Sequence, residues 1–194
     1  MEKYLEKLEK ISRENHIPII KDDGCDFLIE FCKKNSPKNI LEIGTAVGYS
    51  GSFMLLSAKD AHLTTIEKNT ISFNEAKNTF SYLNLSNRVT QILGDAGEEI
   101  KKLQDKYDLI FLDGPKGQYI HYLPILLDLL TKDGTLIADN VLYRGLIRSD
   151  EYVKHKHRTM VVNLRLFLKE IETSDKLITK VYDIGDGIAV IRKK

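Results

Sequence analysis

Short apolar runs alternate with helix-like segments along most of this 194-residue chain. Repeated strand–helix units predict a mostly parallel sheet with helices on both faces. The run Leu109–Leu112 is apolar throughout, as expected for a strand that is covered on both faces. We expect strands at 39–43, 62–66, 89–93, 107–112 and 135–138, and helices at 50–57, 71–83, 97–103, 120–130 and 157–172.

The two ends of the chain depart from this alternation. The last two apolar runs, 177–182 and 188–192, are joined by a connection too short for a parallel crossover, so they predict an antiparallel hairpin. At the other end, helices are expected at 2–15 and from about residue 22 to Pro37. The first helix carries an apolar stripe that packs either on the domain or on a second subunit. No linker divides the chain, so residues 1–194 are expected to form one α/β domain.

Composition is ordinary for a globular protein, with a net charge of +1 that does not by itself indicate a nucleic-acid partner. No apolar run approaches the roughly 20 residues of a membrane helix, and the N-terminus lacks the apolar core of a secretion signal. Cys25 and Cys32 lie about two turns apart on one helix face, too far apart to form a disulfide. We therefore expect reduced thiols and a cytoplasmic protein.

A glycine turn follows the first strand of the alternating pattern, in the stretch from Asn39 to Ser50. The strand stops at Gly44, Gly48 follows, and a helix begins after it. Such a turn lets a ligand approach the backbone and the free N–H groups of the helix start. The G-x-x-x-G spacing matches neither the dinucleotide fingerprint nor a phosphate-binding loop.

Acidic or amide side chains close the next four strands. In open α/β sheets, ligands bind at the carboxyl ends of the strands. Single acidic strand ends are often turn or cap residues, but four in register favour a binding cleft. These residues are Glu67, Asp95, Asp113, Asp139 and Asn140.

Glu67 lies about 20 residues beyond the glycine turn, where nucleotide-binding folds place an acid on the ribose hydroxyls. The sequence therefore predicts an adenosine on this side of the cleft, with Asp95 and Ala96 against the base.

Three oxygen donors, from Asp113, Asp139 and Asn140, follow two neighbouring strands. Carboxylates with a carboxamide suit a hard cation such as Mg²⁺, although Asp-Asn after a strand is also a good turn. Lys116 follows Asp113 by three residues. An ammonium beside a cation gives up its proton more readily and can act as a base. An ordinary loop lysine is the alternative.

Taken together, these motifs resemble the S-adenosyl-L-methionine (SAM)-dependent, cation-dependent class I O-methyltransferases, which include the catechol and caffeoyl-coenzyme A enzymes. The similarity runs from about Pro18 to the C-terminus. It rests on the motifs at 41–50, 94–96, 112–119, 139–140 and 185–187, with Glu67.

The resemblance implies a Rossmann-like, seven-stranded sheet with a reversed C-terminal hairpin, and a homodimer. It implies Mg²⁺ on Asp113, Asp139 and Asn140, with Lys116 and Asp113 as catalytic residues. It also implies a cofactor site, whose residues are Ile20, Glu42, Gly44, Thr45, Ser50, Glu67, Asp95, Ala96 and Asp113.

Two departures from the family bear on the substrate. The chain has no Trp, which in phenol-methylating relatives often walls a flat ring; Tyr143 stands near such a position. A basic segment follows Asp-Asn and could either hold phosphates or be a solvated face. Its candidate RNA-binding residues are Tyr143, Arg144, Arg148, Lys154, Lys156 and Arg158.

The subgroup most similar to the chain is the bacterial tRNA 5-hydroxyuridine methyltransferases. We therefore expect methylation of wobble 5-hydroxyuridine to 5-methoxyuridine, on a base that an anticodon loop can splay out. The first alternative is a small catechol or hydroxycinnamoyl thioester. A second is a non-catalytic module that binds SAM, against which the complete set of metal-binding residues and Lys116 argue. No membrane partner is expected.

Overall fold

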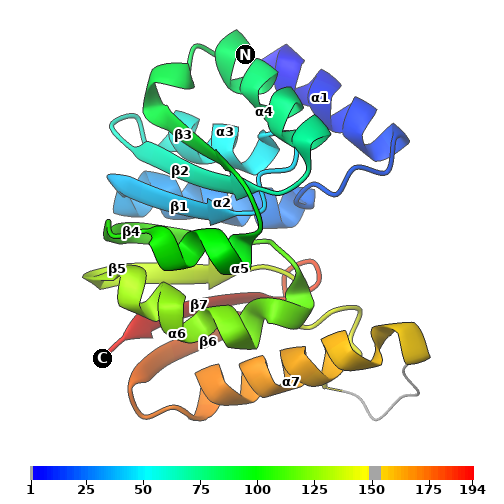
Figure 1. Ribbon diagram of the computed structural model, residues 1–194, viewed down its shortest axis with the longest axis vertical. Helices are drawn as coiled ribbons and strands as arrows, with labels where there is room; N and C mark the ends of the chain where they lie inside the picture. The colour runs from blue at the N-terminus through cyan, green and yellow to red at the C-terminus, as the bar shows by residue number, and fades with distance from the viewer. Residues whose placement is uncertain (1, 149–153) are drawn as a thin grey trace. The chain divides into compact units, whose positions relative to one another are not determined.

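The computed structural model describes residues 2–148 and 154–194 and contains one seven-stranded sheet in the order β3-β2-β1-β4-β5-β7-β6. Helices flank the strands (Figure 1). The predicted Rossmann-like α/β fold, with its mostly parallel sheet and reversed C-terminal hairpin, is confirmed. The chain divides into two compact units, residues 1–96 and 97–194.

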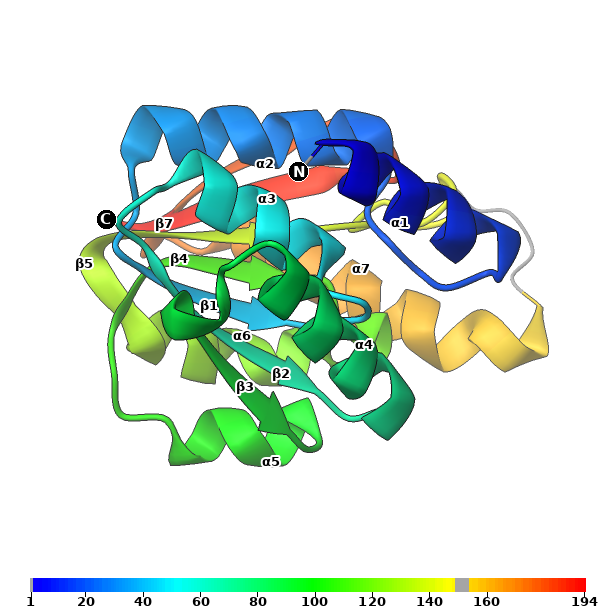
Figure 2. The same cartoon turned by 90° about the horizontal axis from the view of Figure 1, so that it is seen from above.

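Unit 1 contains three parallel strands, β1 (Asn39–Ile43), β2 (His62–Glu67) and β3 (Val89–Leu93), with β2 in the middle. Its helices are α1 (Glu2–Glu14), α2 (Asp22–Asn35), α3 (Tyr49–Ser57) and α4 (Thr70–Tyr82). Figure 2 shows α2 and α3 together beside these strands. The β1–β2 register aligns the ends of the two strands, since Ile43 pairs with Ile66. The turns that follow β1 and β2 therefore start side by side.

Helix α1 packs within unit 1 through part of its apolar stripe. Leu5 is buried, and the Tyr4 ring stacks on that of Tyr82 with 4.0 Å between centroids. Ile11, on the same stripe, is 41% exposed. The sequence left open whether this helix packs on its own domain or on a second subunit. Tyr4 and Leu5 pack within unit 1.

Unit 2 contains the parallel pair β4 (Tyr107–Leu112) and β5 (Leu130–Ala138), followed by the hairpin β6 (Leu177–Tyr182) and β7 (Ile188–Lys193). Strand β7 is antiparallel to both β5 and β6. Helices α6 (Tyr119–Leu129) and α7 (Arg158–Thr173) pack against each other and on this sheet (Figure 1).

Most predicted bounds lie within one or two residues of the observed ones, but two elements differ by more. The helix expected at 97–103 is the short α5 (Ala96–Glu99) followed by a 3-10 turn at Ile100–Lys102, because the segment is too short to bury more than Ile100. Strand β5 begins at Leu130, five residues earlier than expected. Residues 131–134, for which no element was predicted, form a β-irregularity opposite Tyr107–Leu109, where Gly134 lies too close to the Tyr107 carbonyl for a Cβ.

Two further observations concern the predictions of reduced thiols and of no membrane helix. Cys25 and Cys32 are buried and unbridged, and burial raises the pKa of each thiol to about 12. Within 2–148 and 154–194, no helix combines the length and apolarity needed to span a bilayer.

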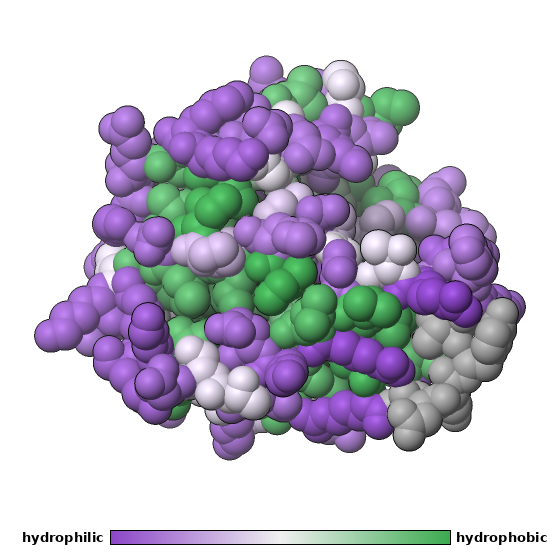
Figure 3. Space-filling model, turned by 60° about the horizontal axis from the view of Figure 1, so that its bottom comes forward, coloured by the Kyte–Doolittle hydropathy of each residue, from purple (hydrophilic) through white to green (hydrophobic). Residues whose placement is uncertain are grey.

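Figure 3 shows apolar side chains reaching the surface between hydrophilic ones, and the exposed apolar residues of unit 2 include Val162, Leu166 and Ile178.

Candidate active site

The glycine turn of unit 1 has the backbone geometry that its sequence predicts. Gly44, Ala46 and Gly48 all have positive φ values, of 100°, 45° and 80°. A Cβ at Gly48 would lie 3.1 Å from the Phe80 ring and 3.3 Å from Ala76, so this position needs glycine for space as well as for conformation. The Gly44 N–H donates to the Ile66 carbonyl at 3.0 Å, which ties the turn to the end of β2.

Glu42, on β1, is a fully buried carboxylate whose two oxygens are both hydrogen-bonded. The hydroxyls of Ser50 and Thr65 donate to Oε1 and Oε2 respectively, each at 2.6 Å. The Thr65 hydroxyl also lies 2.5 Å from that of Thr45. Glu42, Thr45 and Ser50 were predicted to surround the methionine part of SAM; the structure joins them in one buried network, and their contact with SAM stays a prediction.

Thr65 is the member of this network that the sequence did not single out. It lies on β2, opposite Glu42 in the parallel register. A hydroxyl residue within an otherwise buried strand, beside a strand that carries a buried acid, is the signal that could have found it.

Glu67 closes β2, as predicted, and its carboxylate is held by the backbone. The N–H of Ala46 donates to Oε2 at 2.9 Å, and that of Asn69 donates to Oε1 at 2.8 Å. Each oxygen still has a lone pair for a further donor. This fixed, partly exposed carboxylate is suited to accept hydrogen bonds from two adjacent hydroxyls, as the ribose prediction requires.

Three other residues of unit 1 were predicted to contact the cofactor, one before α2 and two after β3. Ile20 is buried just before α2, Asp95 is exposed after β3, and Ala96 is buried at the start of α5. Their roles toward SAM stay predictions, as does the contact of SAM with Asp113.

In unit 2, Asp113 and Asp139 directly follow two paired strands. Leu112 of β4 pairs with Ala138 of β5, and the Asp139 N–H donates to the Leu112 carbonyl at 3.0 Å. The parallel register therefore brings the two aspartates to the same edge of the sheet, as the sequence predicts. Asn140 follows with a left-handed φ of 56°, and its N–H donates to Asp139 Oδ1 at 2.7 Å.

The electrostatics of this aspartate pair favour a positive ligand. Asp139 is 5% exposed, and its burial, followed by the charge of Asp113, raises its pKa from 3.8 to about 7. Burial also raises the pKa of Asp113, against the opposing effect of Lys116. Two adjacent carboxylates that resist ionising together are stabilised by a bound cation.

The donor set fits a hard divalent cation. The described part of the chain contains no group of three or more His, Cys, Asp or Glu side chains that could share a metal ion. The predicted set has only two carboxylates, and its third donor is the carboxamide of Asn140. Oxygen donors without nitrogen or sulfur suit Mg²⁺, which usually keeps several water or substrate ligands.

Lys116 lies beside the same pair of acids. Its Nζ is 3.2 Å from Asp113 Oδ1, and both side chains are about one-fifth exposed, at 22% and 21%. Lys116 begins a 3-10 turn, Lys116–Gln118, in which the Gly117 carbonyl accepts a hydrogen bond of 2.7 Å from the Asn163 side chain of α7. Helix α7 thereby holds the turn that presents the lysine.

Tyr119 is a structural part of this site that the sequence did not identify as such. Its buried hydroxyl donates to the carbonyls of Leu112, at 3.0 Å, and Asp139, at 3.2 Å. Burial raises its pKa well above the ordinary value, so the hydroxyl keeps its proton. The phenol thus bridges the ends of the strands that carry the two aspartates. Its place in the motif of residues 112–119 was the available signal.

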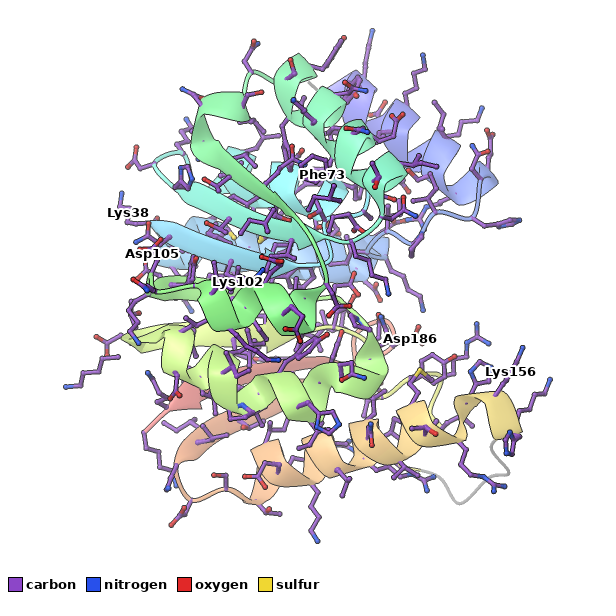
Figure 4. The ribbon with its side chains drawn as sticks, in the orientation of Figure 1. Lys38, Phe73, Lys102, Asp105, Lys156 and Asp186 are labelled. Carbon is purple, nitrogen blue, oxygen red and sulfur yellow. The ribbon has the colours of Figure 1, made fainter. Side chains whose placement is uncertain are left out.

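The predicted RNA-binding residues lie in unit 2, within the described parts of the chain. Lys154, Lys156 and Arg158 are exposed at the N-terminal end of α7, where Figure 4 shows Lys156. The Arg144 guanidinium lies 5.7 Å from the centre of the Tyr143 ring. Arg148 differs from the others because it donates to Glu172 at 2.7 Å.

Comparison with known proteins gives consistent matches. A family model described as O-methyltransferase matches residues 1–194. The catechol O-methyltransferase of Bos taurus is 32% identical, over 77% of this chain and 58% of its own length. The caffeoyl-CoA O-methyltransferase of Populus kitakamiensis is 26% identical, over 89% of this chain and 76% of its own length.

Solved structures agree with these sequence matches. A Staphylococcus aureus protein provisionally assigned as a caffeoyl-CoA O-methyltransferase has 33% identity and a TM-score of 0.91, covering 98% of this chain and 92% of that one. A Podospora anserina methyltransferase with bound S-adenosylhomocysteine has 27% identity and a TM-score of 0.82, covering 91% and 80%.

Proposed function

This chain belongs to the O-methyltransferase family, and from that premise we propose that it methylates wobble 5-hydroxyuridine of tRNA with the help of a divalent cation. The general activity is that of a SAM-dependent O-methyltransferase of the catechol and caffeoyl-CoA type. The proposal adds the cation and the tRNA substrate to this activity.

The observation that carries the cation is the pair of adjacent aspartates, whose pKa values are raised by burial and, for Asp139, by the neighbouring negative charge. Asp113, Asp139 and Asn140 would hold Mg²⁺. A bound Mg²⁺ supplies Lewis acidity, which makes a hydroxyl beside a second oxygen easier to deprotonate.

The chain's own residues then divide the work of methyl transfer. The neutral amine of Lys116 takes up the proton of the acceptor hydroxyl, and Asp113, 3.2 Å away, stabilises the ammonium that forms. On unit 1, Glu67 orients the ribose of SAM through two oxygens that the backbone already fixes. Positioning the reactants in this way accounts for a large part of the rate enhancement that methyl transfer requires.

The tRNA substrate is supported by chemistry and by charge. The 5-hydroxyl of the base lies beside the 4-carbonyl oxygen, so it can chelate a cation as a catechol does. Lys154, Lys156 and Arg158 are exposed on the unit that carries the aspartates, and such a group can neutralise backbone phosphates. Tyr143 would offer a ring on which a splayed base can stack.

A small catechol or hydroxycinnamoyl thioester is the second candidate. The names of the matched bovine and poplar enzymes favour it. The absence of Trp from the chain weakens the aromatic clamp expected for a small phenol.

Nucleoside analysis of tRNA tests the two candidates directly. The purified protein, with SAM and Mg²⁺, should convert 5-hydroxyuridine to 5-methoxyuridine in tRNA from a strain that lacks this protein. Efficient methylation of catechol without any 5-methoxyuridine would favour the second candidate. Unchanged 5-methoxyuridine in that strain, where no redundant enzyme exists, would also contradict the tRNA proposal.

Paired lysine variants test the basic segment separately. Replacing Lys154 and Lys156 by Ala should raise the KM for tRNA about tenfold. The slope of log K for tRNA binding against log salt concentration should become less steep by about two, one for each lost phosphate contact. The matched control replaces Lys169 and Lys176, which are exposed elsewhere in unit 2, and should leave both quantities unchanged. Equal effects of the two pairs would show that only overall charge matters.

We also propose that the protein is a homodimer. The exposed apolar side chains on α1 and α7, which include Ile11, Val162 and Leu166, are compatible with a further packing partner. Light scattering at micromolar concentration tests this, and a monomeric mass would contradict it.

A further inference from the structure

The turn between β6 and β7 is hydrogen-bonded to the loop that follows Asn140. The Leu142 N–H donates to the Asp186 carbonyl at 2.8 Å, and the Val141 N–H donates to the Gly187 carbonyl at 3.0 Å. Gly187 has a φ of 90°, and a Cβ there would lie 2.8 Å from Leu142 Cβ. The turn and the loop are therefore packed too closely for any other residue at 187, and each restrains the other.

The side chain of Asp186 adds a negative charge to the same part of unit 2. The backbone carbonyl of Asp186 is hydrogen-bonded to Leu142, two residues beyond the proposed ligand Asn140, so the residue is held close to the proposed cation site. Figure 4 shows Asp186 at the edge of the unit where β5 ends. Asp183, three residues earlier in the same connection, is exposed and serves as the matched residue.

We propose that Asp186 is a positioning residue of the cation site. Its backbone carbonyl restrains the loop after Asn140, and its carboxylate strengthens cation binding through charge, from outside the ligand set of Asp113, Asp139 and Asn140. Among the described residues, no three His, Cys, Asp or Glu side chains are grouped closely enough to share a metal ion. Asp186 is therefore placed outside the ligand set. This inference rests on the proposed cation-dependent function.

The physical basis is the long reach of charge at a partly buried site. A carboxylate that does not touch the metal still lowers the energy of a divalent cation nearby, since the intervening medium screens less than water. Groups outside the ligand set commonly change metal affinity about 10- to 100-fold when they hydrogen-bond a ligand. For a charge that acts through space alone, we expect about a three- to tenfold effect.

Mn²⁺ binding to the full-length protein, followed by the electron paramagnetic resonance of free Mn²⁺, tests the proposal without any turnover. Asp186→Asn should weaken Mn²⁺ binding about three- to tenfold. The difference should shrink as ionic strength rises. Asp186→Glu, which keeps the charge, should retain most of the affinity, and Asp183→Asn should match the wild type. Thermal unfolding in EDTA should give similar midpoints for all four proteins.

The outcomes separate this inference from the function on which it rests. If the wild type binds Mn²⁺ and Asp186→Asn binds it equally well, the role of Asp186 is wrong while the cation site stands. Equal weakening by Asp183→Asn would also overturn the inference, because proximity would then not matter. If the wild type does not bind Mn²⁺ at all, the cation-dependent function fails, and the role of Asp186 fails with it.

Discussion

Two buried acids, one in each unit, differ in the groups that surround their carboxylates. Glu42 of unit 1 is fully buried, and two hydroxyls donate to its two oxygens at 2.6 Å. Asp139 of unit 2 is 5% exposed, accepts one backbone N–H, and faces the further negative charge of Asp113. The first acid therefore has a hydrogen-bond donor on each oxygen, whereas the second lies beside a further negative charge.

The difference agrees with the proposal that Asp139 holds a cation, and it predicts that Glu42 contributes to the stability of the fold. A buried carboxylate with good donors stabilises the backbone around it, here the glycine turn next to Ser50. A buried carboxylate beside a second one lowers stability until a cation joins them. Substitutions at these two positions should therefore have effects of opposite sign on stability.

The largest expected effect is on catalysis at Asp139. Asp139→Ala should lower kcat about 10³-fold or more, because the cation loses a charged ligand. SAM affinity, measured by calorimetry, should stay within about twofold, since the predicted SAM residues other than Asp113 lie in unit 1. Asp105→Ala, at an exposed acid of the same unit, is the control and should leave activity unchanged. Activity retained in Asp139→Ala would remove the cation from the proposal.

The next effect is on the pH dependence of stability without a cation. An unfolded chain releases the Asp139 proton near pH 3.8, whereas the folded protein holds it to about pH 7. Because the folded state binds more protons in this window, the free energy of unfolding falls as pH rises from about 4 to about 7, by at most about 4 kcal/mol.

Chemical denaturation in EDTA at a series of pH values measures this fall. Asp139→Asn, which has no proton to release, should flatten the curve and be more stable than the wild type at pH 8. Saturating Mg²⁺ should restore most of the lost stability of the wild type. A wild-type curve that rises between pH 4 and pH 7 would show that other groups outweigh the aspartate pair.

The smallest effect is expected at Glu42, and its sign is opposite. Glu42→Gln replaces one accepting oxygen by an NH₂ group that faces a hydroxyl, so it should lower the free energy of unfolding by about 2 kcal/mol. Glu75→Gln, at an exposed acid on α4, should change it by less than about 0.5 kcal/mol. If Glu42→Gln were as stable as the wild type, the contrast between the two acids would fail.

Much of the fold could be predicted because its signals are local. Four strands, β1, β3, β4 and β6, begin and end where the apolar runs predict, and the short final connection correctly indicated an antiparallel hairpin. The positions of Glu67, Asp113 and Asp139 at strand ends followed from the same pattern, because parallel strands bring their carboxyl ends to one edge.

The remaining features depend on contacts between distant parts of the chain. Thr65 completes the Glu42 network only because the β1–β2 register places it opposite that acid. Asp186 meets the loop after Asn140 only through a turn more than 40 residues further along the chain. The early start of β5 was missed because Gly134 is close to the backbone of Tyr107 on the neighbouring strand, a contact that local sequence does not reveal.

The bridge made by Tyr119 has a consequence for the choice of ion. By donating to the carbonyls of Leu112 and Asp139, one rigid phenol limits how far the ends of β4 and β5 can separate. Oxygen ligands lie about 2.1 Å from Mg²⁺ but about 2.3–2.6 Å from Ca²⁺, which also needs more of them. At the proposed cation site, a fixed separation of these strand ends would favour Mg²⁺ over the larger Ca²⁺, although the Tyr119 hydroxyl itself would not touch the ion.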